Sequence, residues 1–317
     1  MYSDGAKFVG TIRNDGVENA EGIELRAADR ELFDILRSLQ IDVNSETMKR
    51  LMLLNTRRRN LGRIIQDTDQ GTDKDNQKVG KRIGTHLEHS LNLVKACDIF
   101  AGLFPPEWRE KYLTKIKQAA ILHDIGKTGP AEASLDEQKT FIRLFSIFPL
   151  DYNVGKEFKT TPIGEAIKKH CLPEEQTEMF SNLSGLGLSP DQLMGEIFGR
   201  HVDYTYRILK SIPNLDPEII FLAASHHRGL HNYPYKLTED ELSALLPAEK
   251  ERAEDLDTAA SIIELADVYE AFSSRGSQKD HSRVIEEMIR VYRRAAEKDP
   301  SRSTKELDIL ERMQTKG

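Results

Sequence analysis

The sequence predicts an all-α protein, and three observations support this prediction. Apolar residues recur three and four positions apart along most of the chain, which is the period of an amphipathic helix. Prolines stand at the expected starts of helices, where they are tolerated. Alternating patterns are few, and only 7–13 and 22–25 suggest short strands. We therefore expect a helical bundle with, at most, a small mixed element near the N-terminus.

Two helices are expected in the N-terminal part of the chain. The first covers 28–39, and the second follows Ser45, a preferred N-cap residue, and runs to about residue 65. Three consecutive arginines in the second helix, 57–59, could form a phosphate-binding patch, but a solvated helix face is the simpler interpretation.

The segment 66–80 is polar and almost without apolar residues, which is typical of a linker. We place a domain boundary there. Residues 1–80 then form a small, mostly helical N-terminal region of unknown role, and 81–317 form the second, larger unit.

Ten further helices are expected beyond the linker, each to within a few residues. Pro105 and Pro106 precede one of them, and Pro213 precedes another. The expected helices cover 81–101, 105–125, 135–148, 160–171, 189–200, 201–212, 216–227, 256–274, 281–297 and 303–315.

The composition excludes several classes of protein. The chain of 317 residues has a net charge of −7, which argues against a general nucleic-acid binder. Its two cysteines, Cys97 and Cys171, are too few for a disulfide scaffold or a cysteine-rich zinc protein. The first residues do not resemble a signal peptide, and no apolar run is long enough to span a membrane. We therefore expect a cytoplasmic protein without membrane insertion.

Histidines and aspartates gather within or at the ends of apolar helix patterns. His123 and Asp124 directly follow the apolar run 119–122, and a pair of histidines follows the apolar run 219–225. Such groups should be buried, and burying an ionisable group is costly unless it is paired or binds a metal. The candidate metal ligands are His89, His123, Asp124, His201, His226, His227 and Asp267.

This set of imidazoles and carboxylates suits divalent metal ions. Fe or Mn is the first expectation, and Zn, Ni or Mg also fits, because no thiolate favours a closed structural zinc site. Seven ligands exceed the need of one tetrahedral ion, so two divalent ions are expected if all seven converge. Two metals can activate a water and clamp the oxygens of a phosphoryl displacement. The competing interpretation is that each histidine is an ordinary core or surface residue.

The segment 121–127 (ILHDIGK) resembles the signature of the HD-domain metal-dependent phosphohydrolases. The order of the other motifs resembles the HD-GYP branch of that superfamily. The matching segments are 88–90 (EHS), 189–209, 223–227 (AASHH), 263–272 (IELADVYEAF) and Arg275. The resemblance covers about 81–275 and leaves 1–80 unexplained.

The resemblance implies an HD-domain helical bundle that holds two metal ions. For the first ion it implies the ligands His89, His123, Asp124 and Asp267. For the second ion, which Asp124 bridges to the first, it implies the ligands His201, His226 and His227.

The resemblance also implies roles in catalysis and substrate binding. Asp124 and Lys127 are the expected catalytic residues, and Lys127 stands one turn beyond His123, where it could neutralise a substrate phosphate. Arg275 matches a phosphate-facing arginine, and Tyr233 belongs to the loop that binds substrate.

The chain departs from the family pattern in three places. Arg228 replaces the glutamate that usually follows the paired histidines, and only Tyr233 and Pro234 remain of the Gly-Tyr-Pro loop, which weakens the case for cyclic di-GMP. Thr85 stands where three-metal members carry a glutamate, so two metals are expected. An insertion at 131–188 replaces a short connection; it could form a lid, a contact in a homodimer or a passive surface elaboration.

The leading hypothesis is a binuclear phosphohydrolase that hydrolyses a phosphodiester, expected to be a cyclic dinucleotide, by attack of a metal-bridging hydroxide. A second hypothesis keeps the metals but changes the substrate to a mononucleotide, a deoxynucleotide triphosphate or a guanosine polyphosphate. A third is a non-catalytic signalling module that binds a nucleotide. The other histidines considered, His86, His170 and His281, are expected to be surface residues.

Overall fold

The computed structural model describes residues 34–39, 46–54, 86–147, 157–227, 240, 250–274, 280–298 and 305–316. Several predictions fall outside these ranges: the strands at 7–13 and 22–25, the arginines 57–59, the linker 66–80, and the positions of Thr85, Arg228, Tyr233 and Arg275.

The all-α fold class is confirmed. The described ranges consist of helices and turns, with no strand and one isolated backbone bridge between Pro162 and Leu193. None of the helices described in these ranges is both long and apolar enough to cross a membrane.

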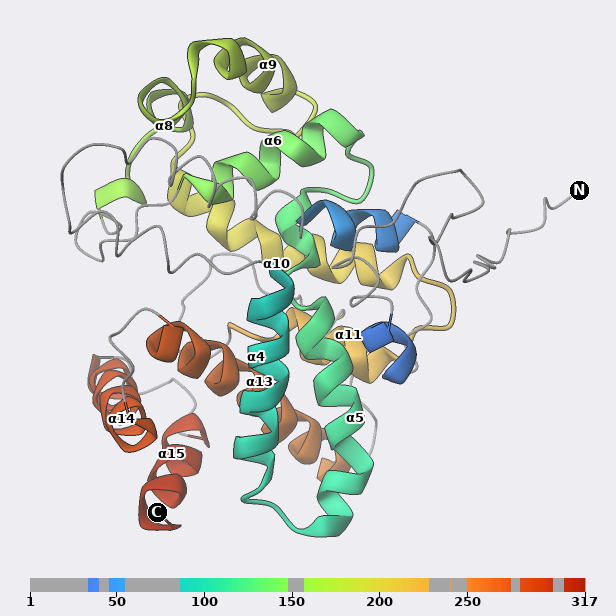
Figure 1. The fold of residues 1–317 in the computed structure, drawn as a ribbon, viewed down its shortest axis with the longest axis vertical. Coiled ribbons are helices and arrows are strands. Elements are labelled where there is room, and N and C mark those ends of the chain that lie inside the picture. Colours follow the sequence, from blue (N-terminus) through green and yellow to red (C-terminus); the bar gives the residue numbers. More distant parts are fainter. Residues whose placement is uncertain are drawn as a thin grey trace, which may run out of the picture.

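Four helices form the centre of the molecule (Figure 1). They are α4 (His86–Ala101), α5 (Pro106–Leu122), α11 (Pro217–Ala224) and α13 (Lys250–Ser274). Their apolar faces form one hydrophobic core that includes Phe100, Ile116, Phe221 and Ile263. Helices α14 (His281–Lys298) and α15 (Lys305–Lys316) pack beside α13 and complete this core.

Proline and charge set the start of two of these helices. Pro105 is the N-cap of α5 and Pro106 its first residue, as the sequence predicts. Helix α11 begins after Asp216, whose carboxylate accepts a hydrogen bond from the backbone N–H of Glu218. The nearly buried Glu218 carboxylate also accepts hydrogen bonds from Lys115 of α5 and Arg252 of α13, at 2.6 and 2.7 Å. These contacts hold the start of α11 against both neighbours.

The insertion forms a second, smaller core. Helices α6 (Leu135–Ser146) and α8 (Ile163–His170) confirm the two helices expected there. Together with α9 (Pro173–Leu183) they lie over one end of α10 (Met194–Lys210), at the top of Figure 1. The residues of this core are buried apart from the main cluster.

Two helix predictions in this region are wrong. Helix α9 was not expected, because its sequence is polar and only Met179 and Leu183 of its side chains are fully buried. Helix α10 was expected as two helices divided between Arg200 and His201, but it runs without interruption through both. It contributes to both hydrophobic clusters, and this packing overrides the weak helix propensity of Gly199.

Part of the N-terminal region packs on the main core. Residues 34–38 and 46–54 are helical, in agreement with the two helices expected there. Leu36 and Leu51 are buried in the same cluster as α4 and α5. The proposed boundary at 66–80 lies outside the described residues and stays a prediction.

Candidate metal centre

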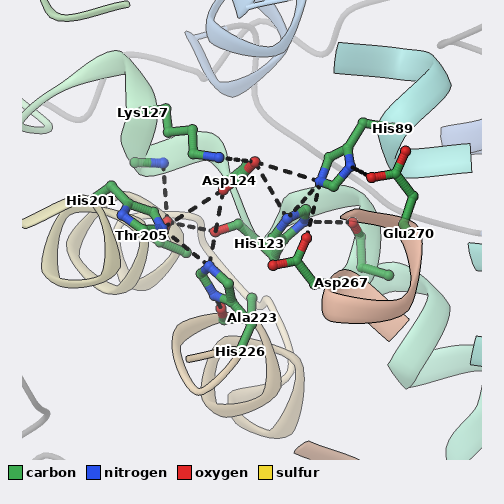
Figure 2. A network of polar contacts seen from close by, with 12 residues as sticks. His89, His123, Asp124, Lys127, His201, Thr205, Ala223, His226, Asp267 and Glu270 are labelled. Carbon is green, nitrogen blue, oxygen red and sulfur yellow. Dashed lines mark hydrogen bonds and ion pairs between the residues drawn. The ribbon is translucent and has the colours of Figure 1, made fainter. Parts of the chain in front are cut away.

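The structure brings the seven predicted ligands together from five helices and the turns that follow two of them, and Figure 2 labels all of them except His227. They form three overlapping groups in which the ligand atoms of each group lie within 4.8 Å of one another. The groups are His89, His123 and Asp267; His123, Asp124 and His226; and His201, His226 and His227.

A tight turn after α5 carries the central residues. Helix α5 ends at Leu122, and His123 and Asp124 precede a short 3-10 helix, η1 (Ile125–Thr128). A Cβ atom at Gly126 would lie 1.9 Å from the carbonyl oxygen of His201, so the turn rests directly on the backbone of α10 and requires glycine there. This close approach places His201 beside His123 and Asp124.

Thr205 of α10 fastens the turn at two points. Its hydroxyl donates a hydrogen bond to the carbonyl oxygen of His123 at 2.8 Å and accepts one from the backbone N–H of Gly126 at 3.0 Å. Both contacts are buried, so α10 and the turn form one rigid unit.

The buried histidines are oriented by backbone carbonyls of their own helical segments. The Nδ1 atoms of His123 and His226 contact the carbonyl oxygens of Ala120 and Ala223 at 2.8 and 2.6 Å. The Nδ1 atom of His201 likewise contacts the carbonyl oxygen three residues earlier, that of Phe198. A carbonyl only accepts, so each Nδ1 carries the proton and each Nε2 presents a lone pair.

These lone pairs face one another across the centre. The Nε2 atoms of His201 and His226 are 3.1 Å apart, and those of His89 and His123 are 3.4 Å apart. Burial lowers the pKa of His123, His201 and His226 to about 3, so these rings are neutral at pH 7. Because two facing lone pairs repel, the arrangement suits a cation placed among them.

Asp124 lies between the two halves of the cluster. Its Oδ2 atom is 3.4 Å from Nε2 of His123 and 3.8 Å from Nε2 of His89. Its Oδ1 atom is 3.7 Å from Nε2 of His201 and 3.9 Å from Nε2 of His226. The Oδ1 atom is buried and has no hydrogen-bond partner among the described residues, which is costly unless another group binds it. The residues present therefore fit a metal site, with one carboxylate oxygen turned toward each half.

Lys127 pairs with Asp124. Its ammonium group donates a hydrogen bond to Oδ2 of Asp124 at 2.5 Å. Burial opposes ionisation of Asp124, but the charge of the His123 ring in its protonated form and the charge of the Lys127 ammonium outweigh it and hold the pKa of this carboxyl well below its usual value.

One residue of the centre was missed by the sequence analysis. Glu270 of α13 accepts a hydrogen bond from Nδ1 of His89 at 2.8 Å, so a carboxylate orients this ring where carbonyls orient the other three. A signal was present, because Glu270 stands three positions after Asp267 and therefore shares its helix face.

The predictions for the remaining histidines have mixed outcomes. His170 and His281 are exposed, as expected. The prediction that His86 is a surface residue is wrong: its side chain is buried, and its ring centroid lies 6.2 Å from that of His89. The two rings are three residues apart on α4 and share its inner face.

Comparisons of the chain with protein-family models, with curated proteins and with solved structures gave no match. The geometry of the cluster is therefore the observation from which a function has to be inferred.

The metal-free protein should lose stability as the pH falls below about 6.5. The pKa of His123, His201 and His226 is about 3 in the folded state and about 6.5 in an unfolded chain. Between these values the unfolded chain binds up to three more protons, so the free energy of unfolding decreases as the pH is lowered through this window. Urea denaturation in the presence of a chelator, repeated from pH 7 to pH 4, measures this. A free energy of unfolding that stays constant over the range would contradict the buried neutral histidines.

Removing the Glu270 carboxylate should weaken metal binding. We expect Glu270→Leu to lower the affinity for Mn²⁺ by about 10- to 100-fold, because His89 loses the group that orients its ring, and Glu270→Gln to lower it less. Isothermal titration calorimetry of the chelator-treated protein measures the affinity. Glu251→Gln, at an exposed position of the same helix, is the matched control. Equal affinities for Glu270→Leu and the control would refute the role of Glu270.

Proposed function

We propose that the protein is a binuclear metal-dependent phosphohydrolase of the HD-GYP-like kind that cleaves a phosphodiester, with a cyclic dinucleotide as its substrate class. The observation that carries this proposal is the position of Asp124. Its two carboxylate oxygens face two different histidine groups, at 3.4–3.9 Å from their Nε2 atoms. A bridging carboxylate between two sets of imidazoles is the arrangement that a two-metal phosphohydrolase needs.

The residues divide into two sets of ligands that share Asp124. The first ion would be held by His89, His123, Asp124 and Asp267, and the second by Asp124, His201, His226 and His227. Nitrogen and oxygen donors without thiolates favour Fe or Mn, and also accept Zn or Ni. When bound, such ions supply Lewis-acid activation of water and neutralise charge on a phosphoryl group.

Among the described residues, the middle of the cluster is more deeply buried than its edges. The side chains of His123, Asp124, His201 and His226 are at most 2% exposed. Asp267 and Lys127 keep 19% and 23% of their side chains exposed. In this proposal, a substrate phosphate would reach the centre beside Lys127 or Asp267, the more exposed members of the cluster.

Lys127 has the position and charge to bind the substrate phosphate. Its side chain is partly exposed, and its ammonium group is held by Oδ2 of Asp124. If this oxygen binds a metal, the ammonium exchanges its carboxylate partner for a phosphoryl oxygen. Lys127 would then stabilise the negative charge that develops on phosphorus oxygens during hydrolysis.

Replacing Asp124 should remove both metal and activity. Asp124→Asn removes the charge that both ligand sets share. We therefore expect clearly fewer than the two metal ions per chain that the proposal requires, and hydrolysis at least about 100-fold slower. Elemental analysis of protein purified without chelators, followed by assays on cyclic dinucleotides, mononucleotides, nucleotide triphosphates and guanosine polyphosphates, tests both. Asp98→Asn, at an exposed ion pair with Lys117, is the control.

The outcomes of this experiment separate the alternatives. Unchanged metal content and activity in Asp124→Asn would exclude the proposed centre. Turnover of only mononucleotides or polyphosphates would favour the second substrate class. A wild-type chain that binds two metals and nucleotides but hydrolyses nothing would favour a signalling module.

Replacing Lys127 should separate catalysis from metal binding. Lys127→Met removes the phosphate-binding charge but no proposed metal ligand, so we expect full metal content and a kcat about 100- to 1,000-fold lower. Lys139→Met is a closely matched control, because Lys139 also pairs with an aspartate three residues earlier at 2.5 Å. A kcat equal to that of the control would show that Lys127 does not act on the substrate.

A further inference from the structure

Arg50 is a buried arginine in the N-terminal region, where no role has been assigned. It lies in the helical segment 46–54, and its side chain is only 1% exposed. Among the described residues it is the largest side chain that is fully buried. Burying a guanidinium group is costly unless its five N–H donors find acceptors, so its partners indicate what the position is for.

The guanidinium group binds the chain segment that leaves the candidate metal centre. Its Nη1 atom donates to the hydroxyl of Thr128 at 2.9 Å, and its Nη2 atom donates to the carbonyl oxygen of Ala131 at 2.7 Å. Its Nε atom donates to Glu46 at 3.1 Å. Thr128 and Ala131 are about 80 positions away in sequence, so these are tertiary contacts and not local ones.

This segment depends on contacts from outside. A 3-10 helix of four residues such as η1 is intrinsically weak. Thr205 fastens its beginning, at His123 and Gly126, and Arg50 fastens its end, at Thr128. Lys127 lies between the two anchors. The hydroxyl of Thr128 also donates to the carbonyl oxygen of Ile125 at 2.7 Å. The same hydroxyl therefore links Arg50 to the backbone at the start of η1.

The hydrogen bonds of Arg50 extend, through Glu46, to the insertion. Glu46, the partner of Arg50, accepts a hydrogen bond from Gln138 of α6 at 3.3 Å. Gln138 in turn donates to the carbonyl oxygen of Ala133 at 2.9 Å. The N-terminal helix, the turn after the centre and the insertion therefore meet at one hydrogen-bonded junction, with Arg50 buried and Glu46 exposed at its edge.

We propose that Arg50 is a positioning residue of the metal centre, and that the N-terminal region is part of the functional unit because it supplies this arginine. Arg50 holds η1 in place and thereby holds Asp124 and Lys127 in the geometry that the ligand sets require. The inference rests on the metal-binding part of the proposed function and does not depend on which phosphate ester is hydrolysed.

The test compares Co²⁺ binding by full-length variants. Arg50→Met keeps the length of the buried side chain but removes all donors, so we expect the Co²⁺ affinity to fall by about 10-fold or more and the visible absorption bands of bound Co²⁺ to change. Arg50→Lys offers donors without the planar fork, so we expect it to restore the affinity only in part. Arg37→Met, at an exposed arginine of the same region, is the control. Circular dichroism confirms that the variants are folded at the temperature of the titration.

A second pair of variants tests the acceptor and does not require Arg50→Met to fold. Thr128→Ser keeps the hydroxyl and Thr128→Val keeps the shape without it. We expect Thr128→Ser to bind Co²⁺ like the wild type and Thr128→Val to resemble Arg50→Met.

Each outcome bears on the proposal. Wild-type affinity and absorption in Arg50→Met, or in Thr128→Val where Arg50→Met does not fold, overturns the role of Arg50 and leaves the proposed function standing. Equal losses in Thr128→Ser and Thr128→Val also overturn it, because the hydroxyl would then not matter. A wild-type chain that binds no Co²⁺, Mn²⁺ or Fe²⁺ overturns both the metal centre and the role of Arg50.

Discussion

The buried carboxylate of Asp124 lies among the nitrogens of four imidazole rings, and this constraint governs the chemistry of the whole centre. The Nε2 atoms of His123, His201 and His226 present lone pairs because their Nδ1 atoms donate to backbone carbonyls, and the Nδ1 atom of His89 donates to Glu270. Lone pairs and a negative charge at 3.1–3.9 Å repel one another. Protonation of the rings does not relieve this repulsion near neutral pH, because the pKa of His123, His201 and His226 is about 3. A divalent cation removes the repulsion without protonating any ring, which is the physical reason that this cluster fits a metal.

Two histidines of the centre also complete the helices that carry them. His123 directly follows the end of α5, and His226 lies two residues beyond the end of α11, where the last carbonyl groups of a helix lack backbone partners. Their Nδ1 atoms contact the carbonyls of Ala120 and Ala223, in those last turns. One hydrogen bond therefore caps the helix, selects the tautomer and aims Nε2 at the centre. Both histidines follow long apolar runs whose last backbone carbonyls would otherwise lack a hydrogen-bond donor.

The sequence allowed the fold class and the seven clustered residues to be predicted, because ionisable side chains at the ends of apolar helices must meet somewhere in the core. It did not reveal Glu270 or the burial of His86, since both depend on which helix faces turn inward around the centre. Helix α9 was missed because its polar sequence has few buried positions, and the continuity of α10 because two separate cores support it. Arg50 could not be predicted at all: its partners are about 80 residues away, and nothing in the local pattern marks it as buried.

The two halves of the centre are not electrostatically equivalent, and this difference accounts for the position of Lys127. The first half contains the carboxylate of Asp267, with Glu270 behind His89, whereas the described ligands of the second half are imidazoles, apart from the shared Asp124. Negative charge therefore accumulates on the first side. The ammonium of Lys127 pairs with Oδ2 of Asp124, the oxygen that faces this side, and leaves Oδ1 without a partner. A cation held in the second half would therefore meet an oxygen that accepts no hydrogen bond from the described residues, whereas a cation held in the first half would compete with Lys127 for Oδ2.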